Sequence, residues 1–322
     1  MSEFPQDEAP RPVLRHSGMA EVRHVESATR QFRSLDHRFG GGSCREAALA
    51  LASWSERVLT HSSTTETVRE RLGQAMADLH NLAAWTCFDT ARPDLAGPHF
   101  DRALELATLV DNHDLTANVL YRTGRVHLHH DRLDDALAAF ERGKASATLA
   151  GSALSEAILC ANEAWAHARK GNRDLALLRM GNARDAFEAA DHRSPPTWAA
   201  FFDEVDLEAT TGVVYTELAI VVDDAYTAFA IPRLTHAIAG YSEGMTRSRA
   251  FSQIALAVNH VVERDFERAA KVGLQAVDSS AKVLSARTRD RLRPLRAAAS
   301  RHEGDDDARE LVERIDRFTG NF

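Results

Sequence analysis

The chain has 322 residues, of which 44% are hydrophobic and 27% charged, and its formal net charge is −8. This length and apolar content are sufficient for a large core, and the high share of alanine, leucine, arginine and glutamate favours helices. The acidic balance disfavours direct nucleic-acid binding, which requires a segregated basic face. No run of 18 apolar residues occurs and the N-terminal segment has no apolar signal core, so we expect a cytoplasmic protein without a membrane span.

The first 18 residues contain three prolines and few apolar side chains, and we predict a disordered lead there. An N-terminal helical segment is predicted over residues 19–75. We interpret Gly40-Gly41-Gly42 as the C-cap of its first helix and a hinge to the second, rather than as a phosphate-binding loop. Ser43 and Glu46 then form a capping-box pattern at the start of the second helix.

Three cysteines, Cys44, Cys87 and Cys160, lie far apart in the sequence and among apolar neighbours. Their odd number and wide spacing are not those of a disulfide framework. We expect buried free thiols in a reducing compartment.

An internal repeat follows the N-terminal segment. Ala96, Ala136 and Ala176 are spaced 40 residues apart, and each is followed by a bulky apolar residue four positions later and a small residue seven positions later. These followers are Phe100 and Ala103, Phe140 and Gly143, and Met180 and Ala183. Two further copies are Ala230, Leu234 and Ala237, and Ala269, Gly273 and Ala276. The spacing places the three residues of a copy on one helix face, where helices approach at the small positions and interlock at the large one.

A partner helix precedes each copy of the repeat. Twelve residues before the marker alanine stand Ala84, Gly124, Ala164, Leu218 and Ala257, and four of these five are small, as close packing requires. This arrangement is typical of tetratricopeptide repeats. We predict an all-α fold, a tetratricopeptide-like superhelical array of antiparallel helix pairs with N- and C-terminal capping helices. Repeats 1–3 are assigned to residues 76–190, an aromatic insertion to 191–211, repeats 4 and 5 to 212–280, and the C-terminal capping helices to 281–322.

A cluster of arginines lies in the C-terminal capping region. Its members are Arg287, Arg289, Arg291, Arg293, Arg296 and Arg301. Acidic residues follow at once between positions 303 and 307, which is typical of a solvated helix face rather than of a nucleic-acid-binding patch. We therefore interpret the cluster as surface charge.

Two segments resemble a known family. The runs HVESATRQFRSLDHRFGGGSCREAALA and AAWTCFDTARPDLAGPHFDRALELA are similar to the sensor half of actinobacterial Xre-type helix-turn-helix regulators, in which a tetratricopeptide domain follows a DNA-binding domain. The resemblance implies a module that senses a ligand or peptide, commonly as a homodimer. Only about twenty residues precede the sensor-like segment, so the DNA-binding function of those regulators is not carried over.

In tetratricopeptide arrays the first helix of each pair lines the concave groove, so residues on its inner face are candidate ligand contacts. These candidates are Asn81, Trp85 and Asp89 in the first unit, Asn118, Tyr121, Arg125 and His129 in the second, Asn162, Trp165 and Arg169 in the third, and Tyr215 in the fourth. Carboxamides can bond an extended backbone, arginines can hold a carboxylate, and aromatic rings contribute contact area. For Trp85 and Trp165, packing between repeats is an equally open interpretation.

Histidines recur nine residues before the marker alanines, at His127, His167 and His260, and Cys87 takes the same place in the first unit. Packing accounts for this register, because equivalent positions on adjacent repeats lie about 9–10 Å apart, too far for ligands of one zinc ion. His127 and His130, which are three residues apart, and His167 remain weak metal candidates without an HExxH or CxxC motif. We expect no cofactor.

No nucleophile elbow, phosphate loop or dinucleotide-binding fingerprint is present, which speaks against an enzyme. The favoured function is a regulatory or adaptor module that binds a peptide or a small metabolite in the groove, with a protein partner as a further option. The alternative is a catalytic or accessory protein of a biosynthetic pathway. Such a protein would use a histidine and aspartate site, with or without a metal, drawn from His129, His130, Asp131 and His167.

Overall fold

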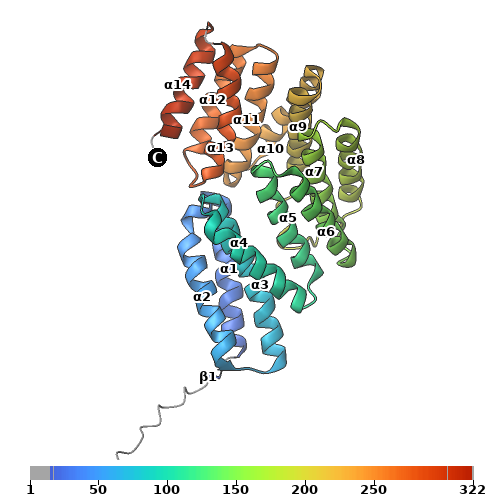
Figure 1. Ribbon diagram of the computed structural model, residues 1–322, viewed down its shortest axis with the longest axis vertical. Coiled ribbons are helices and arrows are strands. Elements are labelled where there is room, and N and C mark those ends of the chain that lie inside the picture. The colour runs from blue at the N-terminus through green and yellow to red at the C-terminus, as the bar shows by residue number, and fades with distance from the viewer. Residues whose placement is uncertain (1–14, 17, 303, 321–322) are drawn as a thin grey trace, which may run out of the picture.

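The computed structural model describes residues 15–16, 18–302 and 304–320. Over these residues the chain forms helices that follow one another in antiparallel pairs joined by short turns (Figure 1). The N-terminal helices are α1 (Met19–Phe39) and α2 (Arg45–His61). The helix pairs are α3 (Glu66–Asp89) with α4 (Pro93–Leu109), α5 (His113–His129) with α6 (Leu133–Leu149), α7 (Ala153–Arg169) with α8 (Arg173–Glu188), α9 (Glu204–Val221) with α10 (Thr227–Gly240), and α11 (Thr246–Val262) with α12 (Phe266–Ser280). The last helices are α13 (Ala286–Ala299) and α14 (Asp306–Gly320).

Other regular structure within the described residues is short. Four 3-10 segments are η1 (Gly41–Ser43), η2 (Asp224–Tyr226), η3 (Glu243–Met245) and η4 (Ser300–His302). The two-residue strands β1 (Arg15–His16) and β2 (Ser62–Ser63) pair in parallel. The predicted all-α array of helix pairs is confirmed, whereas most of the predicted disordered lead lies outside the described residues. None of the described helices is long and apolar enough to cross a membrane.

The turns between paired helices repeat with the 40-residue period of the sequence. Ala91, Asp131 and Gly171 each have a positive φ, of 57°, 60° and 73°. In each turn the next residue donates its N–H to a carbonyl five residues earlier, from Arg92 to Cys87, from Arg132 to His127 and from Asn172 to His167. This is the Schellman arrangement that ends helices. The common register of Cys87, His127 and His167 is therefore the position whose carbonyl closes the first helix of each pair.

Small and large residues interlock between the paired helices, as the repeat predicts. Phe140 on α6 is fully buried, and a Cβ built on Gly124 of α5 would lie 2.3 Å from its ring. The same relationship holds between Gly212 of α9 and Leu234 of α10, where the distance would be 2.7 Å. Only glycine permits such an approach, so these positions set the spacing of the helices within a pair.

The insertion between the third and fourth pairs contributes to the core. Trp198 and Phe202 are 7% and 4% exposed and belong to the same apolar cluster as Phe140 and Trp165. Helix α9 begins at Glu204, inside the segment 191–211 that the sequence assigns to the insertion. The connection is therefore shorter than that segment and brings its aromatic side chains to the inner side of the array.

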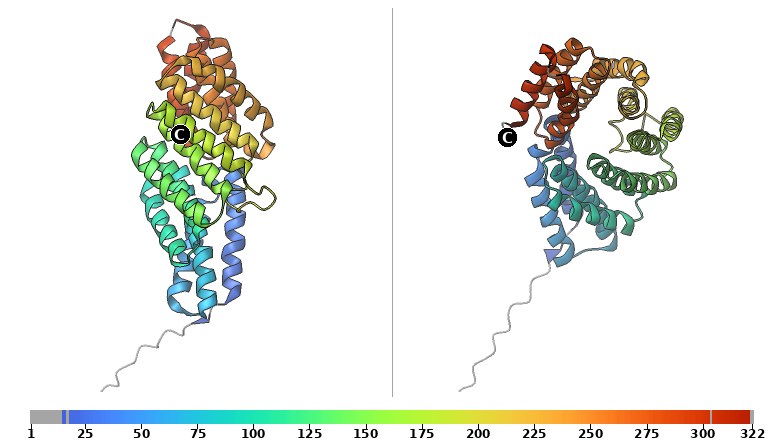
Figure 2. Two further views of the ribbon diagram at one scale, coloured as in Figure 1. Left: turned by 90° about the vertical axis from the view of Figure 1, so that its right-hand side faces the viewer. Right: turned by 45° about the horizontal axis from the view of Figure 1, so that its top comes forward.

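The array curves until its C-terminal helices lie against its N-terminal ones (Figure 2). The Leu284 N–H donates to the Phe39 carbonyl at 2.7 Å, and the Gly42 N–H donates to the Leu284 carbonyl at 3.2 Å. Gly40 has φ +86°, and a Cβ there would lie 2.7 Å from the Leu284 oxygen. The triple-glycine segment thus does more than end a helix, because it allows the backbones at the two ends of the array to touch.

Charged side chains complete this closure. Asp89, at the end of α3, is fully buried and accepts hydrogen bonds from Nε of Arg287 at 2.5 Å, from the Ser285 hydroxyl at 2.7 Å and from the Gly41 N–H at 2.8 Å. Arg247 of α11 lies 3.2 Å from both Asp89 and Asp36. We call Asp36, Asp89, Arg247 and Arg287 the closure network. It joins α1, α3, α11 and α13.

Candidate functional site

The concave side of the closed array holds a pocket with a volume of about 170 Å³. Helix α5 contributes Asn118, Tyr121, Arg122 and Arg125, which are three or four residues apart and therefore lie on one helix face. Helix α7 contributes Ile158, Asn162 and Trp165 at the same spacing. Repeating units thus present equivalent positions to one interior space.

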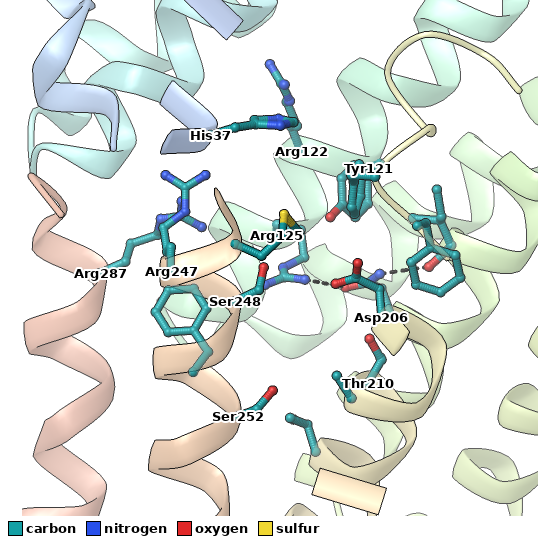
Figure 3. A pocket seen from close by; sticks show the side chains of 18 of the residues that line it. His37, Tyr121, Arg122, Arg125, Asp206, Thr210, Arg247, Ser248, Ser252 and Arg287 are labelled. Atoms are coloured by element: carbon teal, nitrogen blue, oxygen red, sulfur yellow. Dashed lines mark hydrogen bonds between the residues drawn. The ribbon is translucent and has the colours of Figure 1, made fainter. Parts of the chain in front are cut away.

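The opposite wall comes from elements later in the chain. The insertion contributes Trp198, Phe201 and Phe202, α9 contributes Asp206, Ala209, Thr210 and Val213, α11 contributes Arg247, Ser248, Phe251 and Ser252, and α13 contributes Arg287 and Arg291. Asp36, His37, Trp85, Tyr241 and Met245 complete the lining. Figure 3 shows the side chains of Arg125, Arg247 and Asp206 turned toward the same space.

Five arginines line this pocket, and they differ in their partners. Arg247 and Arg287 are paired with the carboxylates of the closure network. Arg122 donates to the Asn81 carbonyl at 3.0 Å, and Arg125 donates to the Asn162 side-chain oxygen at 3.1 Å. Within the part of the chain that the structure describes, Arg122, Arg125 and Arg291 form no salt bridge. The pocket therefore has more positive than negative charge on its wall.

Aromatic rings support these guanidinium groups. Arg125 and Arg291 lie 4.8 and 4.7 Å from the centroid of the Trp165 ring, and Arg291 lies 4.3 Å from that of Phe251. Arg287 lies 4.3 Å from the centroid of the Trp85 ring. The negative face of an aromatic ring attracts a cation and leaves the edge of the guanidinium free to donate hydrogen bonds.

Like charges are close together in this region. Burial lowers the pKa of Arg291 well below its usual value, and the neighbouring Arg125 and Arg287 lower it further. Burial also lowers the pKa of Arg287, although Asp89 opposes the shift. Glu217 opposes part of the shift at Arg291. The three guanidinium groups, of which Arg287 is buried and the other two are partly buried, repel one another, and an anion placed between them would relieve that repulsion.

Two further polar groups of the pocket have no partner. The Asn118 side chain is 1% exposed, and neither its nitrogen nor its oxygen forms a hydrogen bond within the described residues. Nη2 of Arg287 is also buried and unpartnered there, although its Nε binds Asp89. Buried polar groups are nearly always satisfied, so such groups in a cavity are candidate contacts for a ligand.

Asp206 is the second carboxyl group of the wall, besides Asp36 of the closure network. Burial raises its pKa to about 8, nearby Asp203 raises it further, and the Tyr241 hydroxyl, 3.4 Å away, acts in the opposite direction. At neutral pH this carboxyl group is therefore mainly protonated and can donate as well as accept a hydrogen bond. It adds polarity to the pocket without neutralising the arginines.

A second pocket of about 630 Å³ adjoins the first. The two share the side chains of Arg125, Trp165, Val213, Phe251, Arg287 and Arg291. The second pocket extends past Arg169, Glu217 and His129, whose Nε2 lies 3.2 Å from Asp290. The arginine cluster thus lies at the junction of two connected spaces.

The tetratricopeptide repeat family matches residues 74–148, which include most of α3 and α6 and all of α4 and α5. This segment of the chain is therefore similar to tetratricopeptide repeats. Such repeats indicate a protein-interaction or adaptor module, and tetratricopeptide domains commonly bind protein or peptide partners. The matched segment includes Trp85, Asn118, Tyr121 and Arg125 of the pocket. No curated protein matches the chain.

More than half of the ligand contacts that the sequence predicts line one of the two pockets. Trp85, Asn118, Tyr121, Arg125, Asn162 and Trp165 line the first pocket, and His129 and Arg169 line the second. Asn81 is buried behind the wall, and Asp89 belongs to the closure network. Tyr215 stacks on Tyr226 at 6.0 Å and on Phe229 at 5.4 Å, and it lines neither pocket.

The weak metal candidates are not gathered into one place. His130 lines the second pocket, while His127 and His167 lie on the first helices of successive pairs, α5 and α7, with their Nδ1 atoms buried. Among the described residues, no group of three or more histidine, cysteine, aspartate or glutamate side chains could hold a metal ion. Cys44, Cys87 and Cys160 are free and buried, as the sequence predicts, and burial raises the pKa of each thiol to about 11.

The interpretation of the C-terminal arginine cluster as surface charge is wrong for two of its members. Arg287 is 4% exposed, and both Arg287 and Arg291 line the pocket. Their spacing of four residues could have indicated this, because it places Arg287 and Arg291 on the same face of α13. Arg293 and Arg296, in contrast, are exposed. The sequence also gave no indication of Trp198, Phe201, Asp206 or Arg247 as pocket residues.

Proposed function

We propose that the chain is a regulatory or adaptor module whose central pocket binds a peptide or a small metabolite. The observation that carries this proposal is the convergence on the first pocket of buried polar groups without partners, the Asn118 amide and Nη2 of Arg287. A packed core would hold apolar side chains there, since unpaired buried polar groups destabilise the folded protein. Ligand pockets, in contrast, combine aromatic walls with a few such groups.

Ligand binding can be coupled to shape through the closure network. Arg287 lines the pocket and also binds Asp89 at the junction between the two ends of the array. A ligand that contacts Arg287 would therefore favour the closed form over a form in which the ends are apart. A partner protein that binds only one of these two forms would therefore respond to the presence of the ligand.

The alternative of a catalytic histidine and aspartate site has less support. His129 is paired with Asp290 and lies at the edge of the second pocket, and the pKa of His130 is lowered chiefly by burial. His167 lies away from both pockets. A catalytic site would bring such groups to one reacting centre.

A thermal-shift experiment tests the proposed binding function. Low-molecular-weight cell extract, with and without protease treatment, is added to the full chain and to a Ser248→Trp variant, in which a bulky ring occupies the pocket. We expect at least one fraction to raise the melting temperature of the wild-type chain but not that of the variant, because a ligand stabilises the state that binds it. Loss of the effect after protease treatment would identify a peptide.

If no fraction stabilises the wild-type chain, or if the variant responds equally, the pocket is not the binding site that we propose. Ser248→Trp needs to fold for this comparison, so its helical circular dichroism and its unfolding transition are measured first. Thr210→Trp, on the opposite wall, is a second blocking variant.

A further inference from the structure

The junction of the two pockets has the properties of an oxyanion site. Arg125, Arg287 and Arg291 line both spaces, and all three lie within 5 Å of the centroid of a tryptophan ring. Arg287 also has a buried Nη2 atom without a partner. Within the described residues Arg287 is the only one of the three that forms a salt bridge, and the charge of Glu217 also acts on Arg291.

The first pocket has an aromatic wall next to this junction. Tyr121 stacks on Trp198 with centroids 5.7 Å apart and an interplanar angle of 29°, and on Phe201 at 6.4 Å and 27°. Asn118, one helical turn before Tyr121, has both of its amide atoms unpartnered. A flat group can lie against such rings, and a polar substituent on it can satisfy the amide.

We propose that the pocket binds a compact oxyanion attached to an aromatic ring, with the oxyanion between Arg125, Arg287 and Arg291 and the ring against the wall formed by Tyr121 and Trp198. This inference rests on the binding function proposed above and specifies the chemistry of the ligand. A negative charge is favoured because the three guanidinium groups repel one another and Nη2 of Arg287 has a hydrogen bond to donate. An uncharged ligand could accept that hydrogen bond but would leave the repulsion in place.

Two sources can supply this chemistry, a free aromatic acid or the carboxylate of a peptide that ends in an aromatic residue. The pocket volume of about 170 Å³ accommodates a ring with its acid group, and the adjoining space of about 630 Å³ could take a longer chain. The experiment therefore includes a probe of each kind.

Calorimetric titration of the full chain at about 150 mM salt, where long-range attraction is screened, tests the inference. The probes are benzoate, phenyl phosphate and N-acetylphenylalanine, each compared with a neutral counterpart, benzamide, phenol or N-acetylphenylalaninamide. We expect at least one oxyanion to bind about tenfold or more tightly than its neutral counterpart, because a hydrogen bond to a charged group is stronger than a neutral one. The best binder among the three identifies a free carboxylate, a phosphate or a peptide terminus.

Arg291→Met is the decisive variant. It retains an apolar stem and removes a cation that its neighbours repel, so the chain is expected to fold. Its affinity for the best oxyanion should fall at least about tenfold, while its affinity for the neutral counterpart should change little. Arg296→Met on the same helix is the matched control, because its side chain is exposed and lines neither of the two pockets.

The inference is overturned if no oxyanion probe binds, if acids and neutral counterparts bind equally, or if Arg291→Met keeps the wild-type affinity. In any of these cases, a cell-extract fraction that stabilises the wild-type chain but not Ser248→Trp would leave the binding function standing and reject only the anionic ligand. Failure of both experiments would reject both proposals.

Discussion

The Asp89 carboxylate accepts a 2.5 Å hydrogen bond from Nε of Arg287, a residue 198 positions later in the chain. Asp89 is fully buried and Arg287 is 4% exposed, so neither group is hydrated in the folded state. Burial alone would raise the pKa of Asp89, but Arg287, Arg247, the Gly41 N–H and the Ser285 hydroxyl outweigh it and lower the pKa to about 2. The pair connects the two ends of the array and also orients a side chain of the pocket.

Asp89→Ala should reduce the free energy of unfolding by about 3–5 kcal/mol, because two buried arginines lose their shared counterion. The measurement is chemical denaturation, combined with small-angle X-ray scattering to detect a larger radius of gyration as the ends separate. Asp94→Ala is the control, since its exposed pair with Arg92 should contribute no resolvable stability. A variant as stable and compact as the wild type would contradict the role given to this carboxylate.

The same carboxylate predicts acid sensitivity. Its folded pKa of about 2 lies below the ordinary value of 3.8, so its stabilising contribution is present above pH 3.8 and is lost as the pH falls toward 2. The wild-type chain should therefore lose more stability than Asp89→Asn over this interval. Urea denaturation at several pH values between 5 and 2 gives the two curves, and parallel curves would be evidence against the assignment.

Gly40→Ala should destabilise the chain by about 1–3 kcal/mol, because its backbone conformation is one that only glycine adopts readily. The added Cβ would also lie 2.7 Å from the Leu284 oxygen, so the backbone contact between the two ends of the array should be weakened. Gly181→Ala is the opposite case. Gly181 is an exposed residue of α8 with open space around it, and alanine there should add about 0.5–1 kcal/mol. Thermal denaturation of both variants should show shifts of opposite sign.

Asp206→Asn should stabilise the chain increasingly as the pH rises from about 4 to about 8. The raised pKa of Asp206, about 8, means that the folded state holds a proton which the unfolded chain releases near pH 4. Wild-type stability therefore falls through this interval as the pH rises, and the asparagine variant lacks this loss. The difference should level off above pH 8, after changing by about 1.4 kcal/mol for each unit by which burial raises the pKa of Asp206. Equal pH profiles for the two chains would show that the carboxyl group is not perturbed by burial.

The three thiols should be inert in the folded chain. Each is buried, and burial raises each pKa to about 11, so almost no thiolate exists at pH 8. Labelling with a chromogenic disulfide reagent should occur only after unfolding in denaturant and should then titrate all three groups. Rapid labelling of a native sample would contradict the burial of at least one thiol.

The repeating part of the fold could be predicted because its signal is local and recurs. The marker alanines and their followers specify which faces pack, and the same 40-residue register identifies Asn118, Arg125 and Trp165 as inward-facing. Each of these conclusions needs only helical periodicity and the pairing of neighbouring helices.

The rest of the site depends on contacts between segments far apart in the chain. Arg287 and Arg291 enter the pocket only because the array curves until α13 reaches α3, and no residue pattern within α13 encodes that curvature. A charged run of this kind is usually solvated, which explains the mistaken interpretation. The aromatic residues of the insertion, Trp198 and Phe201, fall outside the repeat, so the register could not assign them to a face.

The seam between the first and last helices has a consequence for the order of assembly. Paired helices are neighbours in sequence and can form early, whereas the contact between Asp89 and Arg287 must first overcome the entropy of closing a long loop. During synthesis the wall made by α13 is added last, after the repeats have had time to pack. A chain cut before α13 would retain its helix pairs but lack Arg287 and Arg291, so recognition of a ligand would be a property of the completed polypeptide alone.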